Sequence, residues 1–254
     1  NAIWAAPVLI DLNDDGALEI GVAAMDGRLY VIDGRGRDVG PYPVEVCAPD
    51  ACGLRGARIV STPAIGDLDG DGTLEWVVGT NEIWTGTART YVLDATTASL
   101  GDGWPIDDWA LLFTDDLYVP VVGEGHPASY ALADVDGDGG LDIGNTPSLG
   151  QANIRRHDGE VLWSLEHGQQ GYGIGSDVTE PSFFMVSASP AFGDVDGDGV
   201  PDMVTGGSGA NWLLGLALNN YLDFEHVVGG WSGATGASLE GFPRHVEDWS
   251  LFGT

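Results

Sequence analysis

Acidic side chains recur at a fixed spacing in four nine-residue segments of this chain. The segments are DLNDDGALE (residues 11–19), DLDGDGTLE (67–75), DVDGDGGLD (134–142) and DVDGDGVPD (194–202). When such a loop curls, oxygen side chains at positions 1, 3 and 5 converge, and glycine at position 6 tolerates the positive φ of the sharp turn. The carbonyl of position 7 and the carboxylate of position 9 can complete an oxygen-only shell. This shell suits Ca²⁺ better than Mg²⁺, which keeps its waters and demands a tight octahedron.

The competing interpretation is an EF-hand, which requires a bidentate Glu at position 12 and a helix on each side. Position 12 is instead occupied by Val22, Val78, Asn145 and Thr205. The flanking segments are short apolar runs: VLI precedes the first loop, and EIGVAA, EWVVG, DIGN and DMVTG follow the four loops. Such runs are typical of strands. A second alternative is a set of Asp-Gly turns that bind nothing, but turn chemistry alone does not require acids at positions 1, 5 and 9.

The loops start roughly 60 residues apart, a period that indicates stacked units or a propeller. Each unit has a strand, the acidic loop, a second strand and then two further strands around a polar turn. The third and fourth strands are expected in RLYVIDGRG and DVGPYPV in the first unit, and in RTYVLDATTASL and GDGWPI in the second. An aromatic–Pro step closes three units, at Tyr42, Trp104 and Phe242. Four strands per unit make one blade of a β-propeller. The sequence therefore predicts an all-β propeller of four-stranded antiparallel blades.

The expected blades are residues 1–56, 57–118, 119–182 and 183–242. Residues 243–254 are expected to start a further repeat, because GFPRHVEDWSLFGT echoes the earlier segment GWPIDDWALLFT. Four blades left as an open arc would expose sheet faces and edges. We therefore expect additional blades, from more chain or from a partner subunit. The chain begins at Asn1 without Met, which is typical of a processed or excised segment.

The strings TPAIGDLDGDGTLEWVVG and SPAFGDVDGDGVPDMVTGG resemble FG-GAP/VCBS repeats, the blades of integrin α-subunit propellers and of many bacterial secreted proteins. The resemblance implies a ring of about seven blades in which each loop joins the first two strands of a blade and binds Ca²⁺, giving about four ions here. It also implies main-chain carbonyl ligands at Ala17, Thr73, Gly140 and Val200. The implied side-chain ligands are Asp11, Asn13, Asp15 and Glu19; Asp67, Asp69, Asp71 and Glu75; Asp134, Asp136, Asp138 and Asp142; and Asp194, Asp196, Asp198 and Asp202.

The chain carries a formal charge of −30, from 39 acids and nine bases, all of them Arg. Nucleic acids and anionic membranes are therefore excluded as expected partners. No apolar run approaches the roughly 18 residues of a membrane span. Cys47 and Cys52 are the only cysteines, and their short spacing favours a local disulfide, with free thiols or half of a metal site as alternatives. Disulfides persist and weak calcium sites fill outside the cytoplasm, which indicates an extracellular, cell-surface or periplasmic protein.

Catalytic patterns are scarce: the sequence has no GxSxG, HExxH or GxxxxGK[ST] motif. Its five histidines are scattered, and we expect them in solvated or hydrogen-bonded loop positions. The acid pairs Asp107-Asp108 and Asp115-Asp116 are expected at the surface, because adjacent side chains on an extended chain point apart. Most of the Trp rings are expected to wedge between blades, and Trp84 is the best placed to contact a ligand.

Two function classes remain. The first is a non-enzymatic secreted propeller with structural calcium loops, whose rim loops bind protein or glycan in adhesion or assembly. The second is a fragment of a secreted polysaccharide-degrading enzyme of the lyase type. Lyase chemistry needs a base to remove a proton beside a uronate and a cation to neutralise its carboxylate. A chain with a charge of −30 and no Lys is poorly suited to attract polyuronates unless calcium bridges them.

Overall fold

The computed structural model describes residues 3–48, 57–82, 87–108, 125–147, 152–164, 183–184, 188–209 and 226–246. Within these ranges the secondary structure is entirely β, and the strands form four antiparallel sheets, as the sequence predicted. The strands are β1 (Val8–Ile10), β2 (Glu19–Ala23), β3 (Arg28–Ile32), β4 (Val44–Glu45), β5 (Ala57–Arg58), β6 (Ala64–Gly66), β7 (Glu75–Glu82), β8 (Thr87–Asp94), β9 (Ile106–Asp108), β10 (Ala131–Ala133), β11 (Asp142–Asn145), β12 (Asn153–Arg155), β13 (Val161–Ser164), β14 (Phe183–Phe184), β15 (Ala191–Gly193), β16 (Asp202–Gly209), β17 (His226–Trp231) and β18 (Arg244–Val246).

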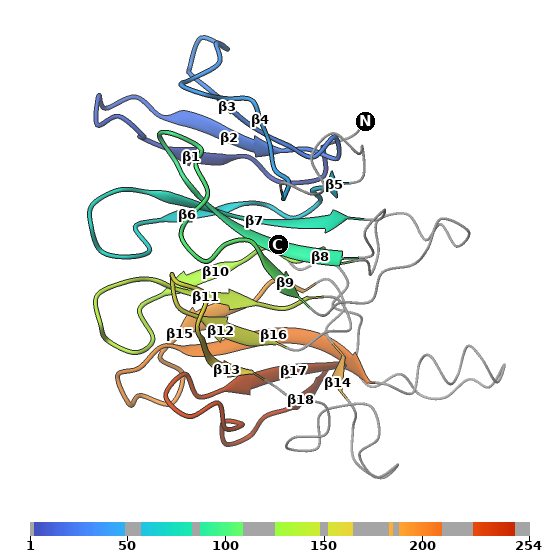
Figure 1. The fold of residues 1–254 in the computed structure, drawn as a ribbon. Helices are drawn as coiled ribbons and strands as arrows, with labels where there is room; N and C mark the ends of the chain where they lie inside the picture. Colours follow the sequence, from blue (N-terminus) through green and yellow to red (C-terminus); the bar gives the residue numbers. More distant parts are fainter. Residues whose placement is uncertain are drawn as a thin grey trace, which may run out of the picture.

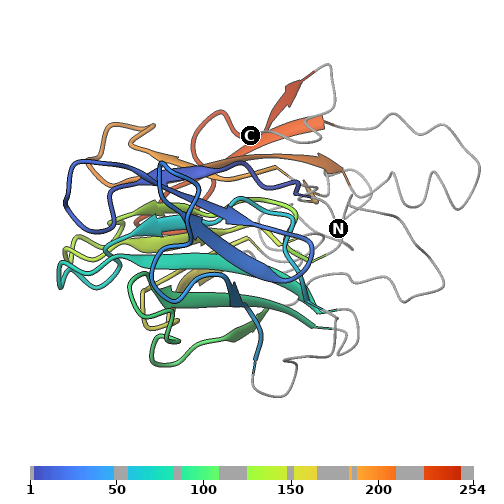
Figure 2. The same ribbon diagram turned by 90° about the horizontal axis from the view of Figure 1, so that it is seen from above.

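Each sheet is one blade, built from strands that are consecutive in the chain. Blade 1 has the order β1-β2-β3-β4 and blade 3 the order β10-β11-β12-β13. In blade 2 the order is β5-β7-β8-β9, with β6 also paired to β7; in blade 4 it is β14-β16-β17-β18, with β15 also paired to β16. The blades are stacked in sequence order, from the blue sheet of blade 1 to the orange and red sheet of blade 4 (Figure 1). Figure 2 shows the same stack from above.

All four blades share one register between the strands that flank the acidic loop. The last residue of the strand before the loop lies opposite position 9, as in Ile10–Glu19 and Gly66–Glu75. The same pairing occurs in the other two blades, at Ala133–Asp142 and Gly193–Asp202. The antiparallel ladder thus holds the position-9 carboxylate beside position 1 in every blade.

The hydrophobic cores lie between consecutive blades. Blades 1 and 2 share a core that includes Leu29, Val31, Trp76 and Tyr91, all fully buried. A second core joins blades 2 and 3, and a third joins blades 3 and 4 through residues that include Ile154, Met203 and Trp231. Burial of each sheet against its neighbours is the packing of a propeller, and it confirms for Trp76 and Trp231 the expected position of Trp rings between blades.

Two kinds of hydrogen bond tie successive blades together. The aromatic side chain of the aromatic–Pro step reaches the next blade: Tyr42 Oη donates to the carbonyl oxygen of Ala95 (2.8 Å), and Trp104 Nε1 donates to that of His157 (2.7 Å). In blades 1, 2 and 3, an amide shortly before the strand that leads into the acidic loop donates to a hydroxyl of the following blade. These bonds form the hydroxyl ladder: Ala6 N to Thr62 Oγ1 (2.9 Å), Thr62 N to Ser129 Oγ (3.2 Å) and Ser129 N to Ser189 Oγ (3.0 Å).

The structure departs from the expected layout after Pro243. Residues 243–254 were expected to begin a further repeat, but β18 pairs with β17 and is the fourth strand of blade 4. The reason is that the aromatic–Pro step precedes the fourth strand of a blade rather than ending the blade, as it also does before β4 and β9. Residues 247–254 lie outside the described part of the chain, as do Trp84, Asp115 and Asp116.

Candidate metal centres

The four acidic loops lie at the same end of the stacked sheets, on the left in Figure 1. They join β1 to β2, β6 to β7, β10 to β11 and β15 to β16. Position 6 has the predicted left-handed backbone in every loop. Its φ is +82° at Gly16, +91° at Gly72, +97° at Gly139 and +92° at Gly199. Glycine adopts this conformation without a steric penalty, which lets the chain reverse within a few residues.

The position-1 carboxylate organises the curl by accepting amide hydrogen bonds from within its own loop. In three loops the donors are the amides of positions 4 and 6: Gly70 (2.9 Å) and Gly72 (3.0 Å) for Asp67, Gly137 (2.7 Å) and Gly139 (3.1 Å) for Asp134, and Gly197 (2.7 Å) and Gly199 (3.1 Å) for Asp194. The acidic side chain is thereby fixed at the centre of the loop.

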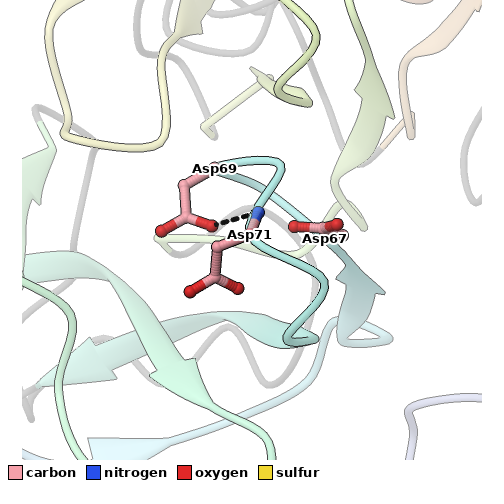
Figure 3. A group of neighbouring side chains, drawn as sticks. All are labelled: Asp67, Asp69 and Asp71. Atoms are coloured by element: carbon pink, nitrogen blue, oxygen red, sulfur yellow. Dashed lines mark hydrogen bonds between the residues drawn. The ribbon is translucent and has the colours of Figure 1, made fainter.

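Positions 3 and 5 are oriented in the same way. In the second loop Asp69 Oδ1 accepts the amide of Asp71 (3.1 Å), and Asp71 Oδ1 accepts the amide of Thr73 (2.7 Å). Figure 3 shows the first of these bonds, with the carboxylates of Asp67, Asp69 and Asp71 gathered around the loop. The third and fourth loops repeat both bonds with their own residues.

In the first, third and fourth loops, position 9 supplies a buried carboxylate. Glu19 and Asp142 are 3% exposed and Asp202 is fully buried. Each position-9 carboxylate accepts the amide of position 2 in its loop, at 2.8–2.9 Å. These carboxylates come from the second strand, so each loop is closed onto its own blade.

The crowding of carboxylates has an electrostatic cost that a cation would remove. Burial raises the pKa of Glu75 to about 7; the amide of Leu68 opposes the rise, and the negative charges of Asp67, Asp69 and Asp71 add to it. Burial also raises the pKa of Asp142, and the charge of Asp136 acts in the same direction. A divalent cation among these groups would stabilise their ionised forms.

Three loops bring acidic oxygens close enough to bind one ion. Within each group the ligand atoms lie within 4.8 Å of one another, and the groups are Asp67, Asp69 and Asp71; Asp134, Asp136 and Asp142; and Asp194, Asp196 and Asp202. Two oxygens that bind one Ca²⁺ at 2.3–2.6 Å are at most about 5 Å apart, so the groups fit this ion. Glu75, Asp138 and Asp198 stand outside the three-residue groups of their loops. The carbonyl ligands expected at Ala17, Thr73, Gly140 and Val200 stay predictions.

The first loop has the same curl with one carboxylate fewer. Asp11 accepts the amides of Asp15 (3.2 Å) and Gly16 (2.9 Å), and Asn13 Oδ1 accepts the amide of Asp15 (3.0 Å). Asn13 Nδ2 also lies 3.4 Å from Glu19 Oε1, to which it donates. The amide oxygen of Asn13 takes the place of a carboxylate at position 3, so this loop offers acids at three of the four side-chain ligand positions (1, 3, 5 and 9), whereas the other loops offer acids at all four.

The third loop has a basic neighbour. Arg156, in the turn between β12 and β13, contacts Asp136 Oδ2 through Nη2 (2.6 Å) and Nε (2.7 Å). Its Nη1 pairs with Glu160 (2.9 Å). The guanidinium holds the position-3 carboxylate in place and neutralises part of its charge. Sequence analysis missed this contact, because the two residues are joined only by the fold of blade 3.

A cavity of about 420 Å³ borders the second loop. Its lining contains six acidic residues: Asp69, Asp71 and Glu75 from the loop, Asp94 and Asp102 from blade 2, and Asp158 from blade 3. Apolar surface from Leu68, Val92 and Leu100 also contributes. The cavity thus lies beside a candidate metal centre and spans two blades.

One surface expectation is wrong. Asp108 is buried, with a side chain 2% exposed, whereas the adjacent Asp107 is 65% exposed. Asp108 accepts the hydroxyl of Thr90 (2.5 Å) and lies 3.3 Å from His126 Nε2 and 3.5 Å from Arg155 Nη2. These partners come from blade 2, the segment before β10, and β12. Adjacent strand residues do point apart, as expected, but here one of the two sides is the interface between blades 2 and 3.

The predicted disulfide is only half within the described residues. Cys47 is 9% exposed at the end of the segment after β4, and Cys52 lies outside the described residues. The disulfide therefore stays a prediction. In the described part of the chain there is no helix of the length and apolarity needed to span a membrane.

Comparison with known proteins shows similarity in fold alone. No protein-family model matches the sequence. No curated protein matches it either. Among solved structures, the quinohemoprotein alcohol dehydrogenase from Comamonas testosteroni is 16% identical over 97% of this chain and 35% of its own, with a TM-score of 0.54. The biofilm matrix protein Bap1 of V. cholerae is 16% identical (94% of this chain, 39% of its own, TM-score 0.44), and the C-terminal domain of Pseudomonas aeruginosa PilY1 is 17% identical (84% and 38%, TM-score 0.47). The chain spans less than two fifths of the length of each of these three proteins. Of the three, the dehydrogenase has the highest TM-score, and its fold is β-propeller-like.

Proposed function

We propose that this chain is a calcium-binding β-propeller module of a secreted protein, of the FG-GAP/VCBS type, that binds protein or glycan without catalysis. In this proposal the calcium loops are structural. They fix one end of each blade, and the partner binds at exposed loops on the rim. About four Ca²⁺ ions are bound, one per acidic loop.

The observation that supports this proposal most is the repetition of one loop geometry. Three loops gather acidic oxygens within 4.8 Å, with the same hydrogen bonds from the amides of positions 4 and 6 to the position-1 carboxylate. Turns that only reverse the chain do not need a buried carboxylate at position 9, yet Glu19, Asp142 and Asp202 are buried there. Hard oxygen donors of this kind are the ligands that Ca²⁺ prefers.

Location outside the cytoplasm is part of the proposal. Sites of this oxygen-cage type on extracellular modules bind calcium with dissociation constants of about 10⁻⁴–10⁻³ M, so they fill at extracellular calcium concentrations. A disulfide between Cys47 and Cys52 would be stable in the same compartments.

The chemistry of the partner follows from charge. The cavity beside the second loop has six acidic residues in its lining, and the chain as a whole carries −30. A neutral glycan that offers hydroxyl groups, or a protein surface with basic side chains, suits this lining. Asp94, Asp102 and Asp158 lie outside the proposed metal sites, and their acidic side chains disfavour a polyuronate, so the cavity does not favour the lyase alternative.

Calcium titration of the metal-free protein tests the first half of the proposal. Isothermal titration calorimetry and native mass spectrometry should find about four ions per chain. Asp67→Asn, Asp134→Asn and Asp194→Asn should each weaken one site, whereas Asp107→Asn, an exposed acid outside the loops, should leave all sites unchanged. A protein that binds no calcium at millimolar concentration would refute the proposal.

A second experiment separates binding from catalysis. The calcium-loaded protein is applied to arrays of neutral and acidic glycans and of basic peptides, and it is also incubated with polyuronates. We expect retention by neutral glycans or basic peptides, and no product that absorbs in the ultraviolet. Accumulation of unsaturated uronates would establish the lyase instead.

A further inference from the structure

One structural position beside the acidic loops differs in charge among the blades. It lies at the end of β3, β8, β12 and β17 or directly after it, opposite position 9 at the start of the neighbouring strand. In blade 2 the ladder pairs Glu75 with Asp94 directly, and in the other blades the adjacent pairs place this position one residue beyond the ladder. We call it the facing position, and its four residues are Asp33, Asp94, Arg156 and Ser232.

In blades 1 and 2 the facing position is acidic, but the two carboxylates have different partners. Asp33 is paired with Arg37, whose Nη2 and Nε lie 2.6 and 2.8 Å from Asp33 Oδ2. Asp94 instead accepts the amides of Thr96 and Thr97, at 2.8 and 2.7 Å, and these donors carry no charge. Because Asp94 also lines the cavity beside the second loop, it adds negative charge to the surroundings of that loop.

In blade 3 the sign is reversed, and the base reaches into the loop. Nη2 and Nε of Arg156 contact the same oxygen of Asp136, Oδ2, at 2.6 and 2.7 Å. The other oxygen, Oδ1, accepts the amide of Asp138 at 3.2 Å. An ion that takes Asp136 as a ligand must therefore compete with a guanidinium that already holds this carboxylate. A second partner for Arg156 is at hand, since its Nη1 lies 2.9 Å from Glu160.

The fourth loop provides the matched comparison, because its side-chain ligands are the same as those of the third. Both loops have Asp at positions 1, 3, 5 and 9, and both bring oxygens of positions 1, 3 and 9 within 4.8 Å of one another. Asp196 accepts the amide of Asp198 at 3.0 Å, as Asp136 does with its own neighbour. The facing residue of the fourth loop, Ser232, is neutral. The two loops thus offer the same acids but differ by one positive charge at the facing position.

We propose that Arg156 is a built-in competitor of calcium, so that the third loop fills only after the second and the fourth. The inference rests on the proposed function, because it concerns the regulation of the same calcium sites. Without calcium, the guanidinium supplies positive charge to the carboxylates of the third loop. An incoming ion is repelled by that charge and must displace it from Asp136. Arg156 is then released toward Glu160, and the protein responds to calcium over a wider concentration range than equal sites would give.

Site-resolved titration by NMR tests this order, with the position-6 amides of Gly72, Gly139 and Gly199 as probes. The Kd of the third loop should exceed that of the fourth by about fivefold to twentyfold, the effect of a unit charge about 5 Å from a divalent ion in water. Arg156→Ser installs the facing residue of blade 4 and should lower the Kd of the third loop to that of the fourth, with the other loops unchanged. Arg35→Ser removes the same charge from the corresponding exposed turn of blade 1 and should leave the third loop unaffected.

Two further measurements separate competition from a purely structural role of the arginine. The Nε–H resonance of Arg156 should shift when calcium saturates the third loop, because its contact with Asp136 is broken. Glu160→Gln removes the second partner of the guanidinium, whose side chain is 63% exposed, and should weaken the third site about twofold to fivefold.

The outcomes distinguish this inference from the proposed function. A third loop that fills together with the fourth or before it would overturn the inference and leave the calcium sites intact. The same conclusion would follow if Arg156→Ser left the third site unchanged or weakened it, or if the Nε–H resonance did not respond to calcium. Absence of calcium from every loop would overturn both the inference and the proposed function.

Discussion

Trp76 of blade 2 packs directly against the backbone of Gly21 in blade 1. The six-membered ring of the indole occupies the space that any side chain at position 21 would need. Both residues lie on the second strand of their blades, one residue apart in the shared register. The pair therefore sets how closely the first two sheets approach each other.

Gly21→Ala should destabilise the protein by about 1–3 kcal/mol, because the added methyl group overpacks the core between blades 1 and 2. Urea unfolding followed by tryptophan fluorescence measures the change. Gly34→Ala is the control, since a Cβ on Gly34 meets nothing within 4 Å and its φ is not positive. Equal stabilities for the two variants would show that blades 1 and 2 are not packed as described.

Features that depend on local sequence were predictable. The spacing of the acidic residues predicted the four loops. The apolar runs around them predicted the paired strands, which hold the position-9 carboxylate near position 1. Glycine at position 6 predicted the sharp turn of each loop, where the backbone has a positive φ. Each of these follows from the conformation of about ten consecutive residues, which a repeated pattern specifies well.

Features that depend on contacts between blades were not predictable from one sequence. The burial of Asp108 depends on Thr90, His126 and Arg155, which lie 18 or more positions away. The bond between Arg156 and Asp136 likewise spans 20 positions. The aromatic–Pro step was recognised as a repeat marker, but its contact with the next blade, as from Trp104 to His157, appears only in the stacked structure.

Removal of calcium should lower the melting temperature markedly. An ion that binds only the folded state stabilises it by RT ln(1 + [L]/Kd), which is about 2.7 kcal/mol per site at a hundredfold excess over Kd. Differential scanning calorimetry in calcium, in EDTA, and in EDTA followed by Mg²⁺ measures the effect, and Mg²⁺ should restore little of it. An unchanged melt after calcium has been shown to be absent would contradict structural roles for the loops.

The first loop should bind calcium more weakly than the loop at Asp67, because Asn13 stands where Asp69 supplies a carboxylate. Asn13→Asp should raise the affinity of the first site, since the hydrogen bond from the amide of Asp15 to the side-chain oxygen can be kept. Site-resolved titration by NMR of the loop glycines Gly16 and Gly72 follows the two sites separately. Saturation of the first site before the second in the wild-type protein would refute this ranking.

The segment that contains Cys47 and Cys52 should carry a disulfide in protein prepared without reductant. The closed loop is short, so the bond should stabilise the fold by about 2 kcal/mol on the chain-entropy estimate, and less if it is strained. Intact mass before and after reduction should differ by about two hydrogens. Alkylation of both thiols in folded, unreduced protein would exclude the bond.

Asp108→Asn should destabilise the protein far more than Asp107→Asn, although the residues are adjacent. Asp108 is buried beside His126 and Arg155, and removal of one partner from a buried charged cluster costs about 3–5 kcal/mol. Asp107 pairs with Arg89 at 2.6 Å but is 65% exposed, so its loss should cost about 0–1 kcal/mol. Equal losses of stability in the two variants would show that the Asp108 side chain is exposed at the surface.

The stability difference between the wild-type protein and Asp108→Asn should also depend on pH. Burial alone would raise the pKa of Asp108, but the close contact with His126, the hydrogen bond from Thr90 and the charge of Arg155 hold it below its ordinary value. A lowered pKa in the folded state stabilises the protein above the unfolded-state pKa, about 3.9 for Asp. This contribution is lost as the pH falls through the folded-state pKa.

Urea unfolding of both proteins from pH 7 to the acid limit should therefore show a difference in stability that is constant near neutrality and narrows below about pH 4. A gap that widens in acid would mean that Asp108 is protonated, rather than ionised, in the folded protein.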